Sequence, residues 1–103
     1  MNRVVREPDR IVLVEWEDAV RVSKETCVPT AATIDAHRCH RVTLGWVAYA
    51  DEAVLACVID EDCYPGSQEN EWDIYPRGIV KRITQVQTGN RLEWADVMDL
   101  ANR

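Results

Sequence analysis

The middle of the chain contains two apolar runs separated by only three residues. Residues 42–50 and 54–59 are almost entirely apolar, and Asp51, Glu52 and Ala53 lie between them. Short runs rich in valine, with a polar break between them, are typical of two strands joined by a tight turn. The pattern therefore predicts a β-hairpin at the centre of the fold.

The segment that follows predicts a second pair of strands. Residues 73–75 read as a short strand, residues 76–78 (Pro-Arg-Gly) mark a tight turn, and residues 79–86 alternate as a closing strand. Two strands, a short strand, a tight turn and a last strand form the second half of a small SH3-like or Sm-like barrel.

A first strand is predicted near the start of the chain. Residues 10–18 place Val12, Val14 and Trp16 on one face, and the opposite face is apolar at Ile11. Two apolar faces are typical of a central or barrel strand that is packed on both sides. The glycine within the run of residues 42–50 indicates the bend that barrel closure needs.

Two helices are expected. Thr30 is a suitable N-cap for a short helix between the first two strands. Asn90 is the expected cap of a last helix, whose apolar stripe has the i, i+3, i+4, i+7 spacing. That stripe consists of Trp94, Val97, Met98 and Ala101.

These elements predict one mainly β domain of the α+β class, residues 1–103. It is a small SH3-like or Sm-like barrel of about five strands with a C-terminal helix. Residues 1–9 are expected to form a flexible arm, residues 10–87 the barrel with an insert at 19–41, and residues 90–102 the helix.

Composition and charge narrow the choice of function. The 103 residues carry a net charge of −6, and residues 42–76 hold eight acidic residues and no basic one. A surface that binds nucleic acid needs cations against the phosphates, so direct nucleic-acid binding is not expected. The charged N-terminus lacks a signal-peptide pattern and no apolar run is long enough to cross a membrane. A cytoplasmic protein with reduced thiols is therefore expected.

The acidic segment is the first candidate site. Its carboxylates, with two aromatic residues as anchors, would meet the basic surface of a partner protein. A solvated loop surface and a mimic of DNA are the alternative interpretations. The predicted contact residues are Asp51, Glu52, Asp60, Glu61, Asp62, Tyr64, Glu69, Glu71 and Trp72.

A second candidate site lies on the turn and the closing strand. Arg77, Lys81 and Arg82 could bind the phosphate of a small nucleotide, with a tryptophan or tyrosine against the base. The alternative is that Arg77 offsets the nearby acidic residues.

A metal site is a further, weaker candidate. Cys27, His37, Cys39 and His40 have the side chains that zinc prefers, but their spacing lacks a C-x-x-C pair. A Cys–His nucleophilic pair lacks an orienting residue and an oxyanion hole. No catalytic residue and no cofactor is predicted, so the chain is not expected to be an enzyme.

Two resemblances extend this interpretation. Arg77 and Gly78 resemble the Arg-Gly pair before the last strand of Sm-like proteins, where the pair helps to line an RNA site on a ring. Residues 14–18, 42–47 and 74–79 resemble the V-x-W-x-D, V-x-Gly-Trp and I-x-Pro-x-Gly-I patterns of small uncharacterised bacteriophage proteins. The second resemblance, over roughly residues 10–86, implies a phage accessory protein that acts in the host cytoplasm.

The predicted function is a non-enzymatic protein that binds and inhibits a host protein through an acidic face. The first alternative is an oligomeric sponge for a nucleotide signal of host defence, which would make the protein a homo-oligomer. The second alternative is a structural component of the virion.

Overall fold

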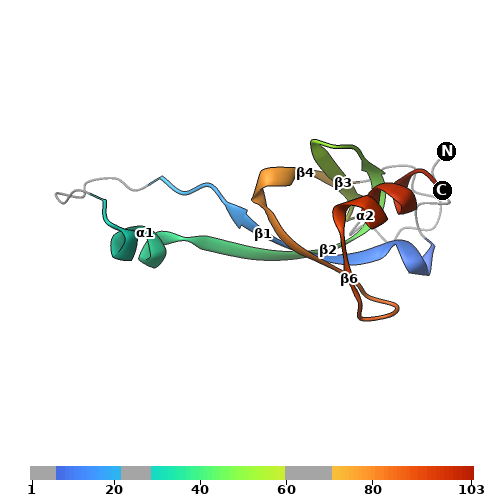
Figure 1. The fold of residues 1–103 in the computed structure, drawn as a ribbon, viewed down its shortest axis with the longest axis horizontal. Coiled ribbons are helices and arrows are strands. Elements are labelled where there is room, and N and C mark those ends of the chain that lie inside the picture. The colour runs from blue at the N-terminus through green and yellow to red at the C-terminus, as the bar shows by residue number, and fades with distance from the viewer. Residues whose placement is uncertain (1–6, 22–28, 60–70) are drawn as a thin grey trace.

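The computed structural model describes residues 7–21, 29–59 and 71–103. Its centre is a six-stranded antiparallel sheet in the order β4-β3-β2-β1-β5-β6, with β4 and β6 at the two ends (Figure 1). The mainly β prediction with a C-terminal helix is confirmed. The elements are η2 (Pro8–Arg10), β1 (Ile11–Asp18), α1 (Ala31–His37), β2 (Cys39–Ala50), β3 (Val54–Val58), β4 (Trp72–Pro76), η3 (Arg77–Ile79), β5 (Val80–Gln85), β6 (Arg91–Leu92) and α2 (Trp94–Ala101).

The first strand lies between two others, as its two apolar faces predicted. β1 pairs with β2 along its whole length, from Ile11 opposite Trp46 to Asp18 opposite Cys39. On its other edge it pairs with β5, with a shift of register after Glu15. The N-terminal strand therefore joins the central hairpin to the closing strand.

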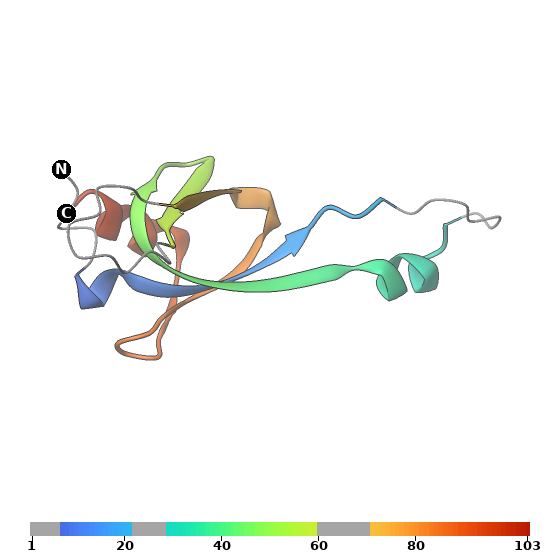
Figure 2. The same cartoon turned by 180° about the vertical axis from the view of Figure 1, so that it is seen from behind.

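β2 is longer than its neighbours, and this length gives the molecule a protruding arm. Its pairing with β3 begins only at Trp46. Among the described strands, the first half of β2 therefore has only β1 beside it, and together with β1 it forms an arm that ends in α1 (Figures 1 and 2). The predicted cap is confirmed, since the Thr30 hydroxyl accepts the backbone N–H of Thr33. No residue of α1 is buried.

The core lies between the inner face of the sheet and α2. The Trp16 and Tyr75 rings pack against each other with their centroids 5.4 Å apart. Val97 brings α2 into this core, and Trp94 and Met98 pack at its margin, as the helical stripe predicted. The fully or nearly fully buried members are Val12, Val14, Val47, Ala50, Leu55, Cys57, Tyr75, Ile83 and Val97.

One apolar face of β2 is not in the core. Val42 and Leu44 are 60% and 56% exposed, while Val47 of the opposite face is fully buried. The inward face carries Gly45, where an added Cβ would lie 2.9 Å from the Val58 backbone oxygen. Gly45 thus permits a close approach of β3. The irregularity in the ladder falls later, between Val47 and Tyr49.

The last helix begins later than predicted. Residues 90–93 were expected to start it, but Arg91 and Leu92 are extended because they pair with Thr84 and Ile83 of β5. Gly89, with φ +75°, forms the turn between these strands. The helix begins at Trp94, and the backbone N–H of Glu93 donates to the Asp96 carboxylate.

Two other predicted boundaries differ from the structure. The insert was expected to reach residue 41, but β2 already begins at Cys39 because it pairs there with Asp18. In the expected N-terminal arm, residues 7–9 are held in place. The Asp9 backbone oxygen accepts the Gln85 side chain at 2.8 Å, and the Asp9 carboxylate pairs with Arg103. The Arg103 guanidinium holds the pKa of Asp9 below its usual value.

Candidate functional site

The outer face of the sheet carries a group of exposed apolar side chains near β4. Register places Ile74 beside Ala56, and Ala56 beside Tyr49 of β2. The next row places Trp72 of β4 beside Val58 of β3. Trp72, Ile74 and Tyr49 are 57%, 55% and 53% exposed, and the two β3 residues between them are covered. These five residues are called the outer patch below.

Acidic residues lie at both ends of this patch. Glu71 precedes Trp72 and is exposed, and its backbone oxygen accepts the Ile59 N–H at 2.8 Å. Asp51 and Glu52 lie in the turn after Tyr49. Of the predicted contact residues, Trp72 lies in the patch and Asp51 lies beside it, with its carboxylate accepting the Tyr49 hydroxyl. Glu52 lies in the adjoining turn, and Glu71 precedes Trp72 along the chain. Asp60, Glu61, Asp62, Tyr64 and Glu69 lie outside the described residues.

The two turn carboxylates also have structural partners. The Asp51 carboxylate accepts the backbone N–H of Ala53 at 2.7 Å and of Val54 at 2.9 Å, and the Tyr49 hydroxyl at 2.8 Å. These hydrogen bonds hold the pKa of Asp51 below its usual value, and the bond from the Ala53 N–H has the largest effect. Glu52 pairs with the Arg77 guanidinium at 3.1 Å. Asp51 therefore organises the hairpin turn, and Glu52 is held by its ion pair with Arg77.

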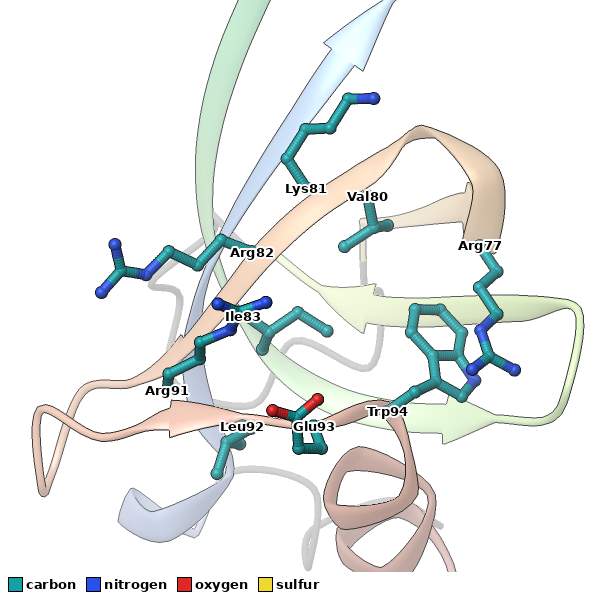
Figure 3. A pocket seen from close by; sticks show the side chains of 9 residues that line it. All are labelled: Arg77, Val80, Lys81, Arg82, Ile83, Arg91, Leu92, Glu93 and Trp94. Carbon is teal, nitrogen blue, oxygen red and sulfur yellow. The ribbon is translucent and has the colours of Figure 1, made fainter.

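The second candidate site is a shallow pocket between β5, β6 and the start of α2 (Figure 3). Its volume is about 160 Å³, below the range of roughly 300–1,000 Å³ that is typical of pockets for small molecules. It can hold an anionic group and leaves most of a nucleotide outside. The lining residues are Arg77, Val80, Lys81, Arg82, Ile83, Arg91, Leu92, Glu93 and Trp94.

Arg77 and Trp94 form one wall of the pocket. The Arg77 guanidinium carbon lies 5.1 Å from the centre of the Trp94 ring, within the range of a cation–π interaction. The Trp94 indole N–H donates to the Asp51 backbone oxygen at 2.7 Å. The ring is therefore fixed between the hairpin turn and η3, and only part of its surface is open.

The predicted cations Lys81 and Arg82 line the pocket but extend away from Trp94 (Figure 3). Lys81 lies 3.9 Å from Glu17, and Arg82 lies 3.9 Å from Glu15. Glu17 is partly buried, whereas the Arg82–Glu15 pair is exposed and so contributes little to stability. Of the three predicted cations, only Arg77 lies beside the aromatic ring.

Arg91 is a pocket residue that the sequence analysis missed. Its side chain faces the same space as Glu93 (Figure 3). Reading residues 88–90 (Thr-Gly-Asn) as a hairpin turn would have placed Arg91 beside the closing strand, because such turns join paired strands. The strong helical stripe that begins at Trp94 favoured the helix instead.

The predicted metal ligands are not brought together. His37 lies on α1, where its Nδ1 is 2.7 Å from the Thr33 backbone oxygen, and Cys39 and His40 begin β2. Cys27 lies outside the described residues. Across residues 7–21, 29–59 and 71–103, no group of three or more His, Cys, Asp or Glu side chains is placed to hold a metal ion.

Cys57 is a core residue within β3. It is 1% exposed, and burial raises the pKa of its thiol to about 12, with a smaller contribution from the Asp73 carboxylate. Because the thiolate is the nucleophile, a thiol with such a high pKa is unreactive at neutral pH.

No protein-family model, curated protein or solved structure matches this chain. In the described part of the chain, the helices are too short and too polar to cross a membrane.

Proposed function

We propose that this protein is a non-enzymatic binding module whose outer patch docks on the basic surface of a partner protein. The strand order and the single 3-10 turn between β4 and β5 support a small SH3-like barrel as its scaffold. Barrels of this kind supply binding faces, and the function depends on the residues that line them.

The observation that carries the proposal is the exposure of Trp72 beside Ile74 on an edge strand. Contiguous exposed apolar residues on a small protein mark interaction sites, and tryptophan is enriched among the residues that contribute most to binding. Neither side chain belongs to the buried core or packs against it.

Charge supports a basic partner. Residues 42–76 contribute eight carboxylates and no cation, and this segment includes the whole outer patch. Carboxylates around an apolar centre steer a positively charged surface towards it and select against acidic partners. On the resemblance to phage proteins, the partner is a host protein that the module inhibits in the cytoplasm.

The test compares the protein with a Trp72→Ala variant and with a Val20→Ala control. Val20 is also exposed, but it follows β1 and lies outside the patch. Immobilised proteins are incubated with bacterial lysate, and each captured protein is purified and titrated by calorimetry at two salt concentrations. We expect the captured partner to be a basic protein. Its affinity should fall at least tenfold for Trp72→Ala and fall as the salt concentration rises, and it should be unchanged for Val20→Ala. Capture that is the same for all three proteins would reject the outer patch as the binding site.

A second candidate function, a sponge for a small nucleotide, is favoured by one observation. Arg77 and Arg91 line one pocket, with the Trp94 ring beside Arg77. Guanidinium groups bind phosphate and an aromatic face can stack on a base. The pocket volume and the Glu93 carboxylate within it weaken this candidate relative to the first.

The nucleotide candidate is tested by titrating the protein with pyrophosphate and with cyclic and linear nucleotides while tryptophan fluorescence is recorded. Binding that is lost in Arg91→Ala and retained in Arg41→Ala, on the arm, would establish the pocket as the site. The absence of any change with these ligands would exclude it. The third candidate, a virion component, predicts that the protein is found in purified particles.

A further inference from the structure

The arm has a free strand edge. β3 pairs with β2 only from Trp46 onwards, so β2 residues 39–45 have β1 on one side. Among the residues that the structure describes, no strand pairs with the other side of this segment. A long exposed edge of this kind is a template for another strand.

Hydrogen bonding shows which backbone groups point outwards. Val86 donates its N–H to the Ile11 oxygen at 3.0 Å, so the oxygen of Ile11 points towards β5. In an antiparallel ladder the direction alternates from residue to residue. The backbone N–H and C=O groups of Val12 and Val14 therefore point towards β2, and those of their partners Gly45 and Thr43 point back towards β1. The N–H and C=O groups of the alternate residues, His40, Val42 and Leu44, point to the free edge.

We propose that a second copy of this chain pairs with this edge in antiparallel orientation, around a two-fold axis at Val42. In that register Val42 faces Val42 of the second copy, and His40 faces Leu44 of the second copy. Every outward N–H and C=O of the three residues then has a partner. A two-fold contact of this kind closes on itself and produces a dimer.

The length of the free edge favours this register. The strand begins at Cys39, and pairing with β3 begins at Trp46, so the free segment is centred on Val42. Moving the axis towards Leu44 would bring the second copy against Trp46, whose edge is already occupied by Val58. The axis at Val42 uses the whole free edge and avoids β3.

The side chains are compatible with self-pairing. The apolar and exposed Val42 and Leu44 gain cross-strand neighbours on one face. On the other face, Arg41 would lie opposite Thr43 of the second copy, so no like charges meet. The Arg41 guanidinium is already neutralised by Asp18 of its own chain at 2.9 Å. The contact lies on the arm, and it does not depend on the function proposed for the outer patch.

The test uses a Val42→Pro variant. Proline removes the N–H that points to the free edge and leaves the bonds to β1 intact, as proline does on an exposed strand edge. Val42→Thr is the matched control, since it keeps the N–H and the β-branched shape. Val42→Lys, which places like charges across the axis, is a second disrupting variant. Mass is measured by light scattering and native mass spectrometry over a range of protein concentrations.

We expect a dimer for the natural protein and for Val42→Thr, and a folded monomer for Val42→Pro and Val42→Lys. Circular dichroism checks that the monomers keep the sheet. Slow hydrogen exchange at His40 and Leu44 in the dimer, lost on dilution, would confirm the edge that pairs. A natural protein that is monomeric at the concentrations used for NMR, an assembly larger than a dimer, or a dimer that persists in both disrupting variants would overturn the proposal.

Discussion

The indole N–H of Trp94 is hydrogen-bonded to the backbone oxygen of Asp51, 43 residues earlier in the chain. The bond attaches the start of α2 to the β2–β3 turn. On the other side of that turn, the Asp51 carboxylate accepts the N–H groups of Ala53 and Val54. One residue therefore organises the hairpin through its side chain and positions the helix through its backbone.

Replacing Trp94 by phenylalanine tests this attachment. An aromatic ring remains, but the Asp51 oxygen loses its partner in a partly buried site. We expect the free energy of unfolding to fall by about 1 kcal/mol, the usual contribution of such a hydrogen bond. Urea denaturation measures it. Trp72→Phe is the control, because Trp72 is exposed and its replacement should change stability by less than about 0.5 kcal/mol. Equal effects of the two substitutions would contradict the assigned role of Trp94.

Two glycines are expected to respond in opposite directions to alanine. At Gly45 the added Cβ would lie 2.9 Å from the Val58 oxygen and 3.0 Å from the Cys57 Cβ. Such overpacking costs about 1–3 kcal/mol. At Gly78 the added Cβ meets nothing within 4 Å, and alanine there should be neutral or stabilise by up to about 1 kcal/mol through the unfolded state. Thermal denaturation of both variants measures the difference, and a stable Gly45→Ala protein would contradict the close approach of β3.

The buried thiol of Cys57 predicts a loss of stability in alkali. Its pKa is about 12 in the folded protein against an ordinary value of 9.0. Above pH 9 the unfolded chain loses this proton while the folded protein keeps it, so the unfolded state is favoured. The contribution of Cys57 is complete below pH 9 and is lost as pH rises towards 12. Urea denaturation of the natural protein and of Cys57→Ala across this range should show a shallower pH dependence in the variant. An identical pH dependence would exclude the thiol as its cause.

Arg10 is the one charged residue that is buried among those the structure describes. Its guanidinium donates to the Val47 oxygen at 3.1 Å and to the Arg103 oxygen at 3.3 Å. Lysine cannot reproduce this forked geometry, so Arg10→Lys should destabilise the protein by about 1–3 kcal/mol. Arg82→Lys, at an exposed position, is the control and should change stability by less than about 0.5 kcal/mol. Calorimetric unfolding distinguishes the two outcomes.

Local patterns predicted the elements well. The polar break after residue 50 predicted the tight turn, and the β-branched residues around Val12 and Ile83 predicted strands that both enter the core. Thr30 was correctly predicted as a cap, because its hydroxyl accepts an N–H of the first helical turn. These features depend on neighbours in sequence, and so they can be read from sequence.

Features that depend on distant partners could not be predicted in this way. Val42 belongs to an apolar run, but it is exposed because its side chain lies on the face of β2 opposite the core. Arg91 was assigned to the last helix, because its pairing with Thr84 depends on the register of the sheet and not on its neighbours in sequence. At the candidate sites, Trp72 was correctly predicted to be exposed. The direction of the Lys81 and Arg82 side chains could not be predicted, because it depends on the register of β5 against β1.

The central place of β1 has a consequence for synthesis on the ribosome. β1 is completed at Asp18, but its second neighbour, β5, ends only at Gln85. Until that strand emerges, β1 can pair only with β2, and the edge of β1 that later binds β5 has no partner strand. Pairings between strands so distant in sequence form slowly, and unpaired edges expose intermediates to aggregation. The last third of the chain therefore completes the fold, and a chain arrested before β5 should be a substrate for chaperones and proteases.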